Sequence, residues 1–342
     1  MPEIPVEQYR MTGFYLSAFL LSFVFSVLLV PYIARFARRW GAVDIPTVAR
    51  KIHLKEIPLW GGLAIYLSFF LTLSFFCMSH PFFEEHGLKG IWGIFFGATL
   101  ITITGVIDDR KGLPPKVKLF GQILSALILA GFGIRMHGMS VPFTDVYFVF
   151  PGIISWILTL IWVVLLVNAF NFIDGLDGLA GGITVIVSLT LFLIAQKLYG
   201  TVSAGPAENS NIYTVVFSTI VLAGAASGFL LYNFSPAWIF MGDTGSQFIG
   251  FLLAALTVTG VMKEAAALTV FIPVLVLGVP LLDTFAAVVR RLRRGLPISR
   301  ADKNHIHHVL MKKGFSPRQV VLILYLVSIG FACLAYLLSK GR

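Results

Sequence analysis

Ten long apolar runs divide this sequence, and they limit its fold more than any other feature. Each is close to the length of about 20 apolar residues that a helix needs to cross a bilayer. A soluble domain could not bury so much apolar surface, since 57% of the 342 residues are hydrophobic and 12% are charged. The sequence therefore predicts an all-α polytopic membrane protein, with runs at 13–35, 59–79, 88–107, 117–135, 151–168, 178–198, 212–231, 246–262, 265–290 and 319–338.

The ninth run, 265–290, is expected to be kinked or broken, which would give 10–11 transmembrane helices in all. It contains Pro273, Pro280 and Asp283, and a proline inside a helix removes a hydrogen bond and clashes with the preceding turn. No polar stretch is long enough for a second domain, so residues 1–342 are expected to form a single integral membrane domain. The loop 136–150 alternates in polarity, which favours a short hairpin.

Lys and Arg residues indicate the orientation. With the N-terminus outside, most of the 26 fall into three inner loops, around 35–55, 110–118 and 290–318. Positive residues collect in cytoplasmic loops and near anionic lipids, so we expect the N-terminus outside. The same tendency explains the formal net charge of +10 without a nucleic-acid partner. Cys77 and Cys333 lie in apolar runs and are expected to be small, buried hydrophobic residues.

Acidic residues collect on the same inner face, although they were not used to set the orientation. The motif GVIDDRKG (105–112) ends the third run with Asp108 and Asp109. Adjacent carboxylates repel one another, and a bound cation relieves that repulsion. The alternative is a solvated helix end beside Arg110 and Lys111.

Two further motifs carry acids beside small residues. In NAFNFIDGLDGLAGG (168–182), polar groups recur every third residue and could share a helical face that binds Mg²⁺ or a nucleotide: Asn168, Asn171, Asp174 and Asp177. In MGDTGS (241–246), small residues around Asp243 would let a phosphate or metal approach, at a helix start that favours anions. For both Asp177 and Asp243, the alternative is a helix cap.

Basic and histidine residues complete the inner face. His305, His307 and His308 lie in the loop before the last run, near Arg300 and Lys303, and suit a diphosphate or sugar better than zinc, because no Cys or Glu has ligand spacing. Lys51 and Lys55 in the first inner loop could meet a phosphate or lipid headgroups. Asp283 lies within a run, where an acid is costly and functional by default, and its role is left open.

These motifs, in this order, resemble the polyprenyl-phosphate N-acetylhexosamine-1-phosphate transferases, a superfamily that includes the phospho-MurNAc-pentapeptide translocase. The resemblance covers nearly the whole chain. It implies transfer of GlcNAc 1-phosphate from UDP-GlcNAc to undecaprenyl phosphate with release of UMP, at the cytoplasmic face of a bacterial inner membrane. The product would begin an envelope polysaccharide such as teichoic acid or O-antigen. Mg²⁺, replaceable by Mn²⁺, would be the cofactor, and a homodimer is left open.

The resemblance also implies a role for individual residues. Asp243 matches the Mg²⁺ ligand, Asp108 and Asp109 the acidic pair at the reaction centre, and His307 the first histidine of the C-terminal motif. A substrate-binding set is expected to comprise Lys51, Lys55, Asn171, Asp174, Asp177, Asn233, Arg300, His305 and His308. Lys51 and Lys55 compete for one phosphate-binding role, because the spacing to Pro58 is shorter than in the MurNAc-pentapeptide branch.

The substrate branch follows from two local differences. This chain has His-Ile-His-His where the MurNAc-pentapeptide branch has three consecutive histidines, and Leu59-Trp60 where that branch has Thr-Met. Both favour UDP-GlcNAc, with UDP-MurNAc-pentapeptide as the alternative. Direct attack and a covalent phospho-Asp intermediate both remain open. Two other classes of protein are alternatives. A transporter would need polar groups at several depths of the membrane. A CDP-alcohol phosphotransferase would need an Arg after its first Asp-Gly and a further Asp pair downstream, and 174–182 has neither.

Overall fold

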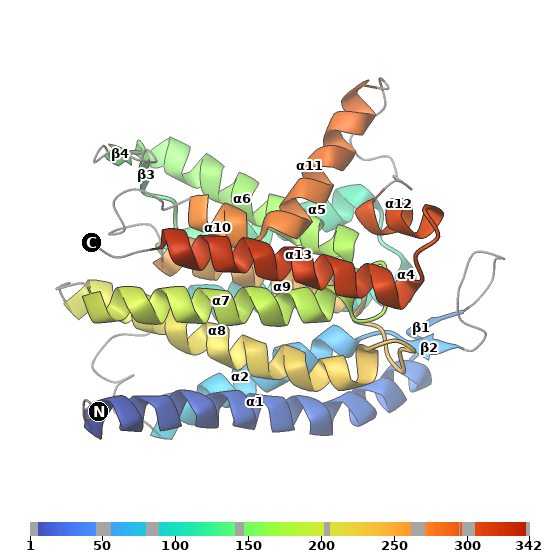
Figure 1. Ribbon diagram of the computed structural model, residues 1–342, viewed down its shortest axis with the longest axis horizontal. Helices are drawn as coiled ribbons and strands as arrows, with labels where there is room; N and C mark the ends of the chain where they lie inside the picture. Colours follow the sequence, from blue (N-terminus) through green and yellow to red (C-terminus); the bar gives the residue numbers. More distant parts are fainter. Residues whose placement is uncertain are drawn as a thin grey trace.

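Long helices that run side by side make up most of the protein, shown as a computed structural model in Figure 1. The structure describes residues 6–45, 56–79, 89–140, 147–201, 206–260, 271–293, 295 and 305–339. Its helices are α1 (Val6–Arg39), α2 (Gly61–Ser79), α4 (Lys89–Lys111), α5 (Pro115–Gly131), α6 (Gly152–Ile173), α7 (Leu179–Thr201), α8 (Pro206–Asn233), α9 (Gly242–Gly260), α10 (Phe271–Val276), α11 (Gly278–Arg293), α12 (Ile306–Lys312) and α13 (Pro317–Leu338).

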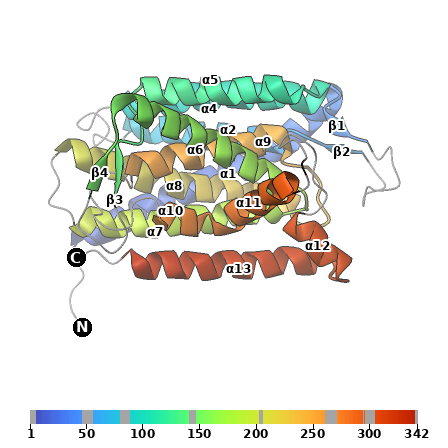
Figure 2. The same ribbon diagram turned by 90° about the horizontal axis from the view of Figure 1, so that it is seen from above.

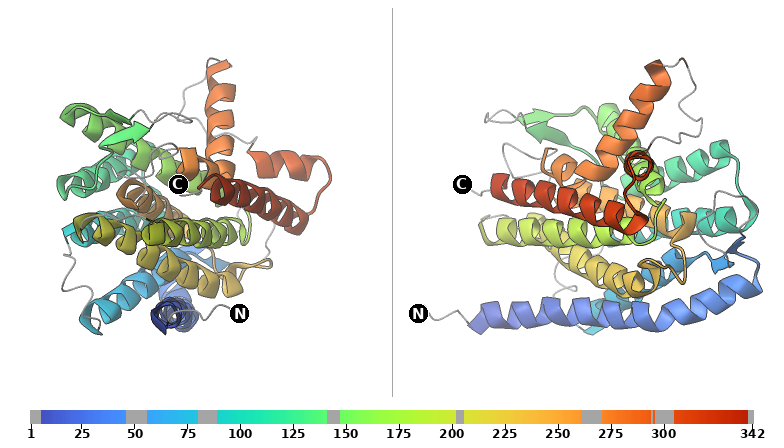
Figure 3. Two further views of the ribbon diagram at one scale, coloured as in Figure 1. Left: turned by 60° about the vertical axis from the view of Figure 1, so that its left-hand side comes forward. Right: turned by 45° about the vertical axis from the view of Figure 1, so that its right-hand side comes forward.

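Within the described ranges every predicted apolar run falls on a helix, and the ninth run, of which 265–270 lies outside the described residues, is broken as expected. Its two parts, α10 and α11, separate at Leu277, and α11 then leaves the direction of the bundle (Figure 3). Seven helices of the described chain are long and apolar enough to cross a membrane. Of the others, α5 has 17 residues, which is near the lower limit for a span, and α9 begins with a polar turn. A helical, polytopic membrane protein is therefore confirmed.

Helix α9 forms the core of the bundle. It packs against α2, α4, α6 and α8, and its large side chains, such as Phe248, Phe251 and Leu252, are fully buried. A helix that is apolar all round is stable only when neighbours cover every face. The polar N-terminal turn of α9 is thereby fixed relative to four other helices.

Outer helices expose apolar side chains at helical spacing. On α1 these are Leu16, Leu20, Val24 and Leu28, each between 44% and 57% exposed, and α13 exposes Leu322 and Leu326 in the same way. Soluble monomers rarely expose apolar patches of this extent. These stripes are the surface expected to face lipid.

Two small hairpins mark opposite ends of the bundle. The predicted hairpin in 136–150 is confirmed, since β3 (Gly138–Ser140) pairs with β4 (Tyr147–Val149) in antiparallel register. A second hairpin, β1 (Val43–Asp44) with β2 (Ile57–Pro58), was not predicted. The β1–β2 hairpin and α12 lie at one end, while the β3–β4 hairpin and the start of α1 lie at the other (Figures 1 and 2).

The chain after β2 docks directly against the start of α9. The backbone N–H groups of Gly61 and Gly62 donate to the carbonyls of Phe240 and Met241, each at 2.9 Å. A Cβ on Gly62 would lie 1.9 Å from the Cα of Gly245, so only glycine allows this approach. Gly245 of MGDTGS therefore serves helix packing, a role that the sequence did not suggest.

Replacing Gly62 by alanine should destabilise the protein. The added methyl group would overlap the backbone of Gly245, and overpacking of this kind costs about 1–3 kcal/mol. We expect a lower melting temperature in detergent for Gly62→Ala. Gly330→Ala is the matched control, because a Cβ at Gly330 of α13 meets nothing within 4 Å. Equal melting temperatures for the two variants would contradict the proposed backbone contact.

Candidate active site

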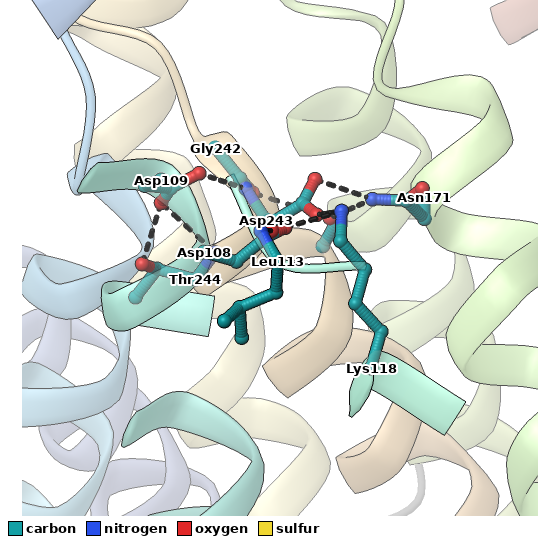
Figure 4. A network of polar contacts seen from close by, with 9 residues as sticks. Asp108, Asp109, Leu113, Lys118, Asn171, Gly242, Asp243 and Thr244 are labelled. Carbon is teal, nitrogen blue, oxygen red and sulfur yellow. Dashed lines mark hydrogen bonds and ion pairs between the residues drawn. The ribbon is translucent and has the colours of Figure 1, made fainter. Parts of the chain in front are cut away.

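Two carboxylates from different helices converge on one lysine at the start of α9. Lys118 of α5 places its Nζ 2.5 Å from Oδ2 of Asp243 and in direct contact with Oδ2 of Asp108, at the end of α4. Figure 4 shows the three side chains meeting between the helices. The side chain of Asp108 is 4% exposed, that of Asp243 is 22% exposed and that of Lys118 is 31% exposed, so Asp108 is buried while Asp243 and Lys118 are partly exposed.

Asp109 points elsewhere and caps α9. Its Oδ1 accepts the backbone N–H of Asp243 at 2.7 Å. Its Oδ2 accepts both the backbone N–H and the hydroxyl of Thr244, at 3.1 and 2.6 Å. The first N–H groups of a helix have no partner within the helix, and a carboxylate there also suits the positive end of the helix dipole. Asp109 therefore holds the turn that carries Asp243 (Figure 4).

Asn171 orients Asp243 from a third helix, α6. Its Nδ2 donates to Oδ1 of Asp243 at 2.7 Å and to the hydroxyl of Ser246 at 3.1 Å. The four polar residues of 168–177 do not act as one face, because Asn168 instead donates to Gln122 on α5 at 2.8 Å. Asp174 follows the end of α6, and its carboxylate has no hydrogen-bond partner within the described ranges.

The loops after α6 and α8 are tied together by Asp177 and Asn233. Asp177 accepts the backbone N–H of Ala237 at 3.0 Å, so it does not act as the cap of its own following helix. Asn233, only 3% exposed, accepts the N–H of Gly178 at 3.0 Å and donates to the carbonyl of Ile239 at 2.9 Å. Both side chains thus position the loop that leads into MGDTGS.

The histidine motif rests on Asp283. One carboxylate oxygen accepts Nδ1–H of His305 at 2.8 Å, since an ionised carboxylate can only accept, and the other accepts the backbone N–H of Ile306 at 2.8 Å. Asp283 and His305 are 3% and 6% exposed. Asp283 therefore fixes the start of α12, which carries His307 and His308.

His307 links this motif to the 174–178 loop. A Cβ on Gly175 would lie 2.7 Å from Nε2 of His307, so the ring packs directly against that glycine. The His307 ring is stacked parallel to His305 with centroids 5.9 Å apart, and its centroid lies 4.2 Å from that of His308. His307 is 2% exposed, and within the described chain its Nδ1 has no hydrogen-bond partner.

Burial shifts the pKa values of Asp174 and His307, which lie near the site. Burial, together with the charges of Asp243, Asp109 and Asp177, raises the pKa of Asp174 well above its usual value. Burial and the neighbouring His308 lower the pKa of His307 to about 4. His307 is therefore neutral at pH 7, and it can offer a hydrogen bond but no positive charge.

The donor set fits magnesium. In the described part of the chain no group of three or more His, Cys, Asp or Glu side chains is placed to hold a metal. Mg²⁺, however, is usually bound by one or two carboxylates, with water and substrate phosphates as its remaining ligands. Asp108 and Asp243 already converge on a cation, the Lys118 ammonium, which is the arrangement such a site needs.

Three predicted site residues, Lys51, Lys55 and Arg300, lie outside the described residues. Two residues that sequence reasoning did not place at the site, Lys118 and Thr244, contact its acids directly. In the sequence, Lys118 stands out only as one of the positive charges of an inner loop. The signal that could have found it is a cation at the start of an apolar run, ten residues after Asp108.

Comparison with known proteins identifies the family. The sequence profile of glycosyl transferase family 4 matches residues 91–261. The chain is 38% identical over 324 residues, 95% of this chain and 85% of the relative, to a probable undecaprenyl-phosphate N-acetylglucosaminyl 1-phosphate transferase of Bacillus subtilis. The matches define a polytopic membrane transferase. The chain belongs to glycosyl transferase family 4.

Two further relatives support the same assignment. A decaprenyl-phosphate N-acetylglucosaminephosphotransferase of Mycobacterium tuberculosis is 38% identical over 306 residues, 85% of this chain and 74% of the relative. An undecaprenyl-phosphate alpha-N-acetylglucosaminyl 1-phosphate transferase of Escherichia coli is 26% identical over 316 residues, 90% of this chain and 79% of the relative. The likeness extends over nearly the full chain, as the resemblance of the motifs implied.

Replacing Thr244 by valine should loosen the start of α9. The variant keeps the side-chain shape but removes the hydroxyl that donates to Asp109, and a hydrogen bond to a charged group contributes about 1.5–3 kcal/mol. We expect a lower melting temperature and faster hydrogen exchange in the first turns of α9. Thr244→Ser retains the hydroxyl and should exchange like the parent protein. Unchanged exchange in Thr244→Val would show that the hydroxyl bond to Asp109 does not help to hold this helix.

The pKa of His307 predicts a pH dependence of stability. Between about pH 4 and 6.5 the unfolded chain binds a proton that the folded protein excludes, so stability falls as the pH drops through this window. His307→Asn should lose this contribution, which is at most about 3 kcal/mol, and should melt with a flatter dependence on pH. The measurement is melting temperature in detergent from pH 4.5 to 7.5. Parallel curves for variant and parent would refute a buried, neutral His307.

Proposed function

We propose that this protein transfers N-acetylglucosamine 1-phosphate from UDP-N-acetylglucosamine to undecaprenyl phosphate and releases UMP. The observation that carries the proposal is the convergence of Asp108 and Asp243, from α4 and α9, on a single cation. The names of the Bacillus subtilis and Escherichia coli relatives supply the sugar and the lipid. The relative from Mycobacterium tuberculosis is named for decaprenyl phosphate, so an acceptor of a different prenyl length is the nearest alternative.

The reaction is an exchange of one phosphoanhydride bond for another. An oxygen of the lipid phosphate attacks the β-phosphorus, which carries the sugar, and forms the new P–O bond. The bond between that phosphorus and the oxygen shared with the α-phosphate breaks, and UMP leaves with the electron pair. A phosphate monoester has a second pKa near 6, so the lipid phosphate is largely a dianion at pH 7 and needs no strong base.

Asp243 and Asp108 are the residues we propose to hold Mg²⁺. When bound, the metal supplies positive charge where the diphosphate oxygens accumulate negative charge. Asn171 keeps one oxygen of Asp243 turned toward α6 through its 2.7 Å hydrogen bond. This leaves Oδ2, the oxygen that contacts Lys118, as the one directed at the cation.

Of the adjacent acids, we assign a direct chemical role to Asp108 and a positioning role to Asp109. Three hydrogen bonds from Asp243 and Thr244 engage both oxygens of Asp109. Asp108 accepts the backbone N–H of Leu113 through Oδ1 at 2.6 Å and presents Oδ2 to Lys118. This division supports Asp108 as the acid that acts at the reaction centre, through the Oδ2 atom that we propose to hold the metal.

The remaining polar residues are proposed to bind the donor. Asp174 lies next to Asp243 and, with its raised pKa, can donate as well as accept a hydrogen bond to the uridine or the ribose. His307 is neutral and buried against Gly175, and its unpartnered Nδ1 is available to a sugar or phosphate oxygen. Lys51, Lys55 and Arg300 are proposed to contribute positive charge to the diphosphate.

We place the active end at the cytoplasmic face of a bacterial inner membrane. Basic residues close to that end, such as Arg38, Arg39 and Arg110, support this orientation through the positive-inside tendency. UDP-sugars would then reach the site from the cytoplasm, and the acceptor would reach it from the bilayer. The product would be the first lipid-linked intermediate of an envelope polysaccharide.

The test is UMP release by purified protein in detergent. The assay contains undecaprenyl phosphate, Mg²⁺ and, in separate reactions, UDP-GlcNAc, UDP-GalNAc or UDP-MurNAc-pentapeptide. We expect lipid-dependent UMP from UDP-GlcNAc. Asp243→Ala and added EDTA should each lower the rate by at least about 100-fold, the size of effect seen when one electrostatic stabiliser is removed.

Each other outcome has a defined meaning. UMP from another sugar alone would keep the mechanism and overturn the assignment of GlcNAc. Full activity of Asp243→Ala would overturn the proposed metal site. Folded protein that releases no UMP from any of the three donors would refute the proposed function.

A further inference from the structure

Lys118 occupies the place where the two site carboxylates meet. Its ammonium contacts Oδ2 of Asp108 and lies 2.5 Å from Oδ2 of Asp243. The three residues come from α4, α5 and α9, so the contact joins three helices. Within the described chain, the ion pairs of these two Oδ2 atoms are both with Lys118.

A cation between these acids offsets an electrostatic repulsion. Two carboxylates that contact the same ammonium lie close enough to repel each other, and a positive charge between them relieves that repulsion. Without a divalent metal, the Lys118 ammonium supplies that charge. The contact therefore offsets the repulsion between the two acids and joins their helices before any ligand arrives.

The ammonium and a divalent metal need the same oxygen atoms. Mg²⁺ binds carboxylate oxygens at about 2.0–2.1 Å, a distance at which an ammonium in contact with the same oxygens would meet it as a like charge. Both cations cannot share the position. Lysine suits temporary occupancy, because its ammonium is a compact charge on a flexible four-carbon stem.

We propose that Lys118 is a resident counter-cation, which fills the metal position between Asp108 and Asp243 and must leave it when a divalent metal binds. The inference rests on the proposed metal-dependent function and adds how the site is held when no metal is present. Metal cannot bind while the lysine occupies the position. The apparent affinity for free metal is therefore the intrinsic affinity multiplied by the fraction of time that the position is open. The protein would then load metal chiefly together with the negatively charged donor.

Metal binding without substrate tests the proposal directly. Mn²⁺ is titrated into the purified, full-length protein in detergent at pH 7.5, and free Mn²⁺ is measured by electron paramagnetic resonance. Lys118→Met removes the ammonium and keeps much of the apolar stem. Its dissociation constant for Mn²⁺ should fall by about tenfold or more, which corresponds to an ammonium that occupies the position at least nine-tenths of the time.

The matched control is Lys116→Met. Lys116 lies two residues earlier on the same helix, is exposed, and has no ion pair or hydrogen bond in the described structure. Its loss removes the same unit of charge from the same helix, so it reports the general electrostatic effect, which we expect to be less than about threefold at moderate salt. Lys118→Arg keeps the charge and should bind Mn²⁺ as weakly as the parent protein.

A second measurement uses the unaltered protein, in case Lys118→Met does not fold. Lysines are acetylated with an amine-reactive ester, with and without Mg²⁺, and modification is quantified by mass spectrometry. Metal should increase acetylation of Lys118 severalfold relative to Lys116, because the ammonium is released from its two carboxylates.

Two results would overturn the proposal. One is a Lys118→Met protein that binds Mn²⁺ no more tightly than Lys116→Met, and the other is Lys118 acetylation that Mg²⁺ leaves unchanged relative to Lys116. Neither measurement contains a sugar nucleotide or lipid. If UMP release fails while Mn²⁺ binding tightens as described, the transferase function is wrong and the counter-cation stands. If UMP is released but Lys118→Met does not tighten Mn²⁺ binding, only the counter-cation is refuted.

Discussion

The first turn of α9 lies inside the bundle, where two other helices approach its backbone with no side chain between them. Gly62 of α2 contacts Gly245, and a Cβ on Gly105 of α4 would lie 2.5 Å from the Cα of Thr244. A helix start buried in this way exposes unpaired N–H groups to an apolar interior, which is costly unless they are satisfied. Asp109 satisfies two of them. Since Asp243 is the second residue of α9, the packing that fixes this turn also places the proposed metal ligand.

The division between Asp108 and Asp109 follows from helix geometry. Consecutive residues of an α-helix point about 100° apart, so the two adjacent acids at the end of α4 meet different partners. Asp109 reaches the N–H groups of α9, while Asp108 reaches Lys118 on α5. Because Asp109 holds the turn that carries Asp243, loss of activity in an Asp109 variant would not by itself show that Asp109 touches substrate.

The sequence predicted what depends on local pattern. The apolar runs, the break between α10 and α11 and the β3–β4 hairpin follow from hydropathy, proline position and alternation. The sequence could not show pairings between distant segments. Lys118 has the position expected of any inner-face lysine, and its pairing with Asp243 depends on how α5 packs. Asp109 caps a helix 134 residues away, and Asp283 meets His305 only because α11 leaves the bundle direction and α12 returns toward it.

The same long-range contacts explain why the expected single face at 168–177 does not exist. Asn171 and Asn168 lie three residues apart on α6, yet Asn171 donates to Asp243 on α9 and Asn168 donates to Gln122 on α5. Asp177 lies beyond the helix end and joins the loop before α9. Spacing alone predicted a shared face, but the neighbours of α6 decide what each residue contacts.

Charge balance links these contacts to the proposed chemistry. Five carboxylates surround the start of α9, those of Asp108, Asp109, Asp174, Asp177 and Asp243, and Lys118 contributes one positive charge among them. The positive end of α9 is already used by Asp109. A diphosphate that entered this region alone would add negative charge at low dielectric, where like charges repel strongly. The proposed diphosphate donor would therefore need added positive charge, which the proposed Mg²⁺ and the basic residues proposed to bind it, Lys51, Lys55 and Arg300, would share.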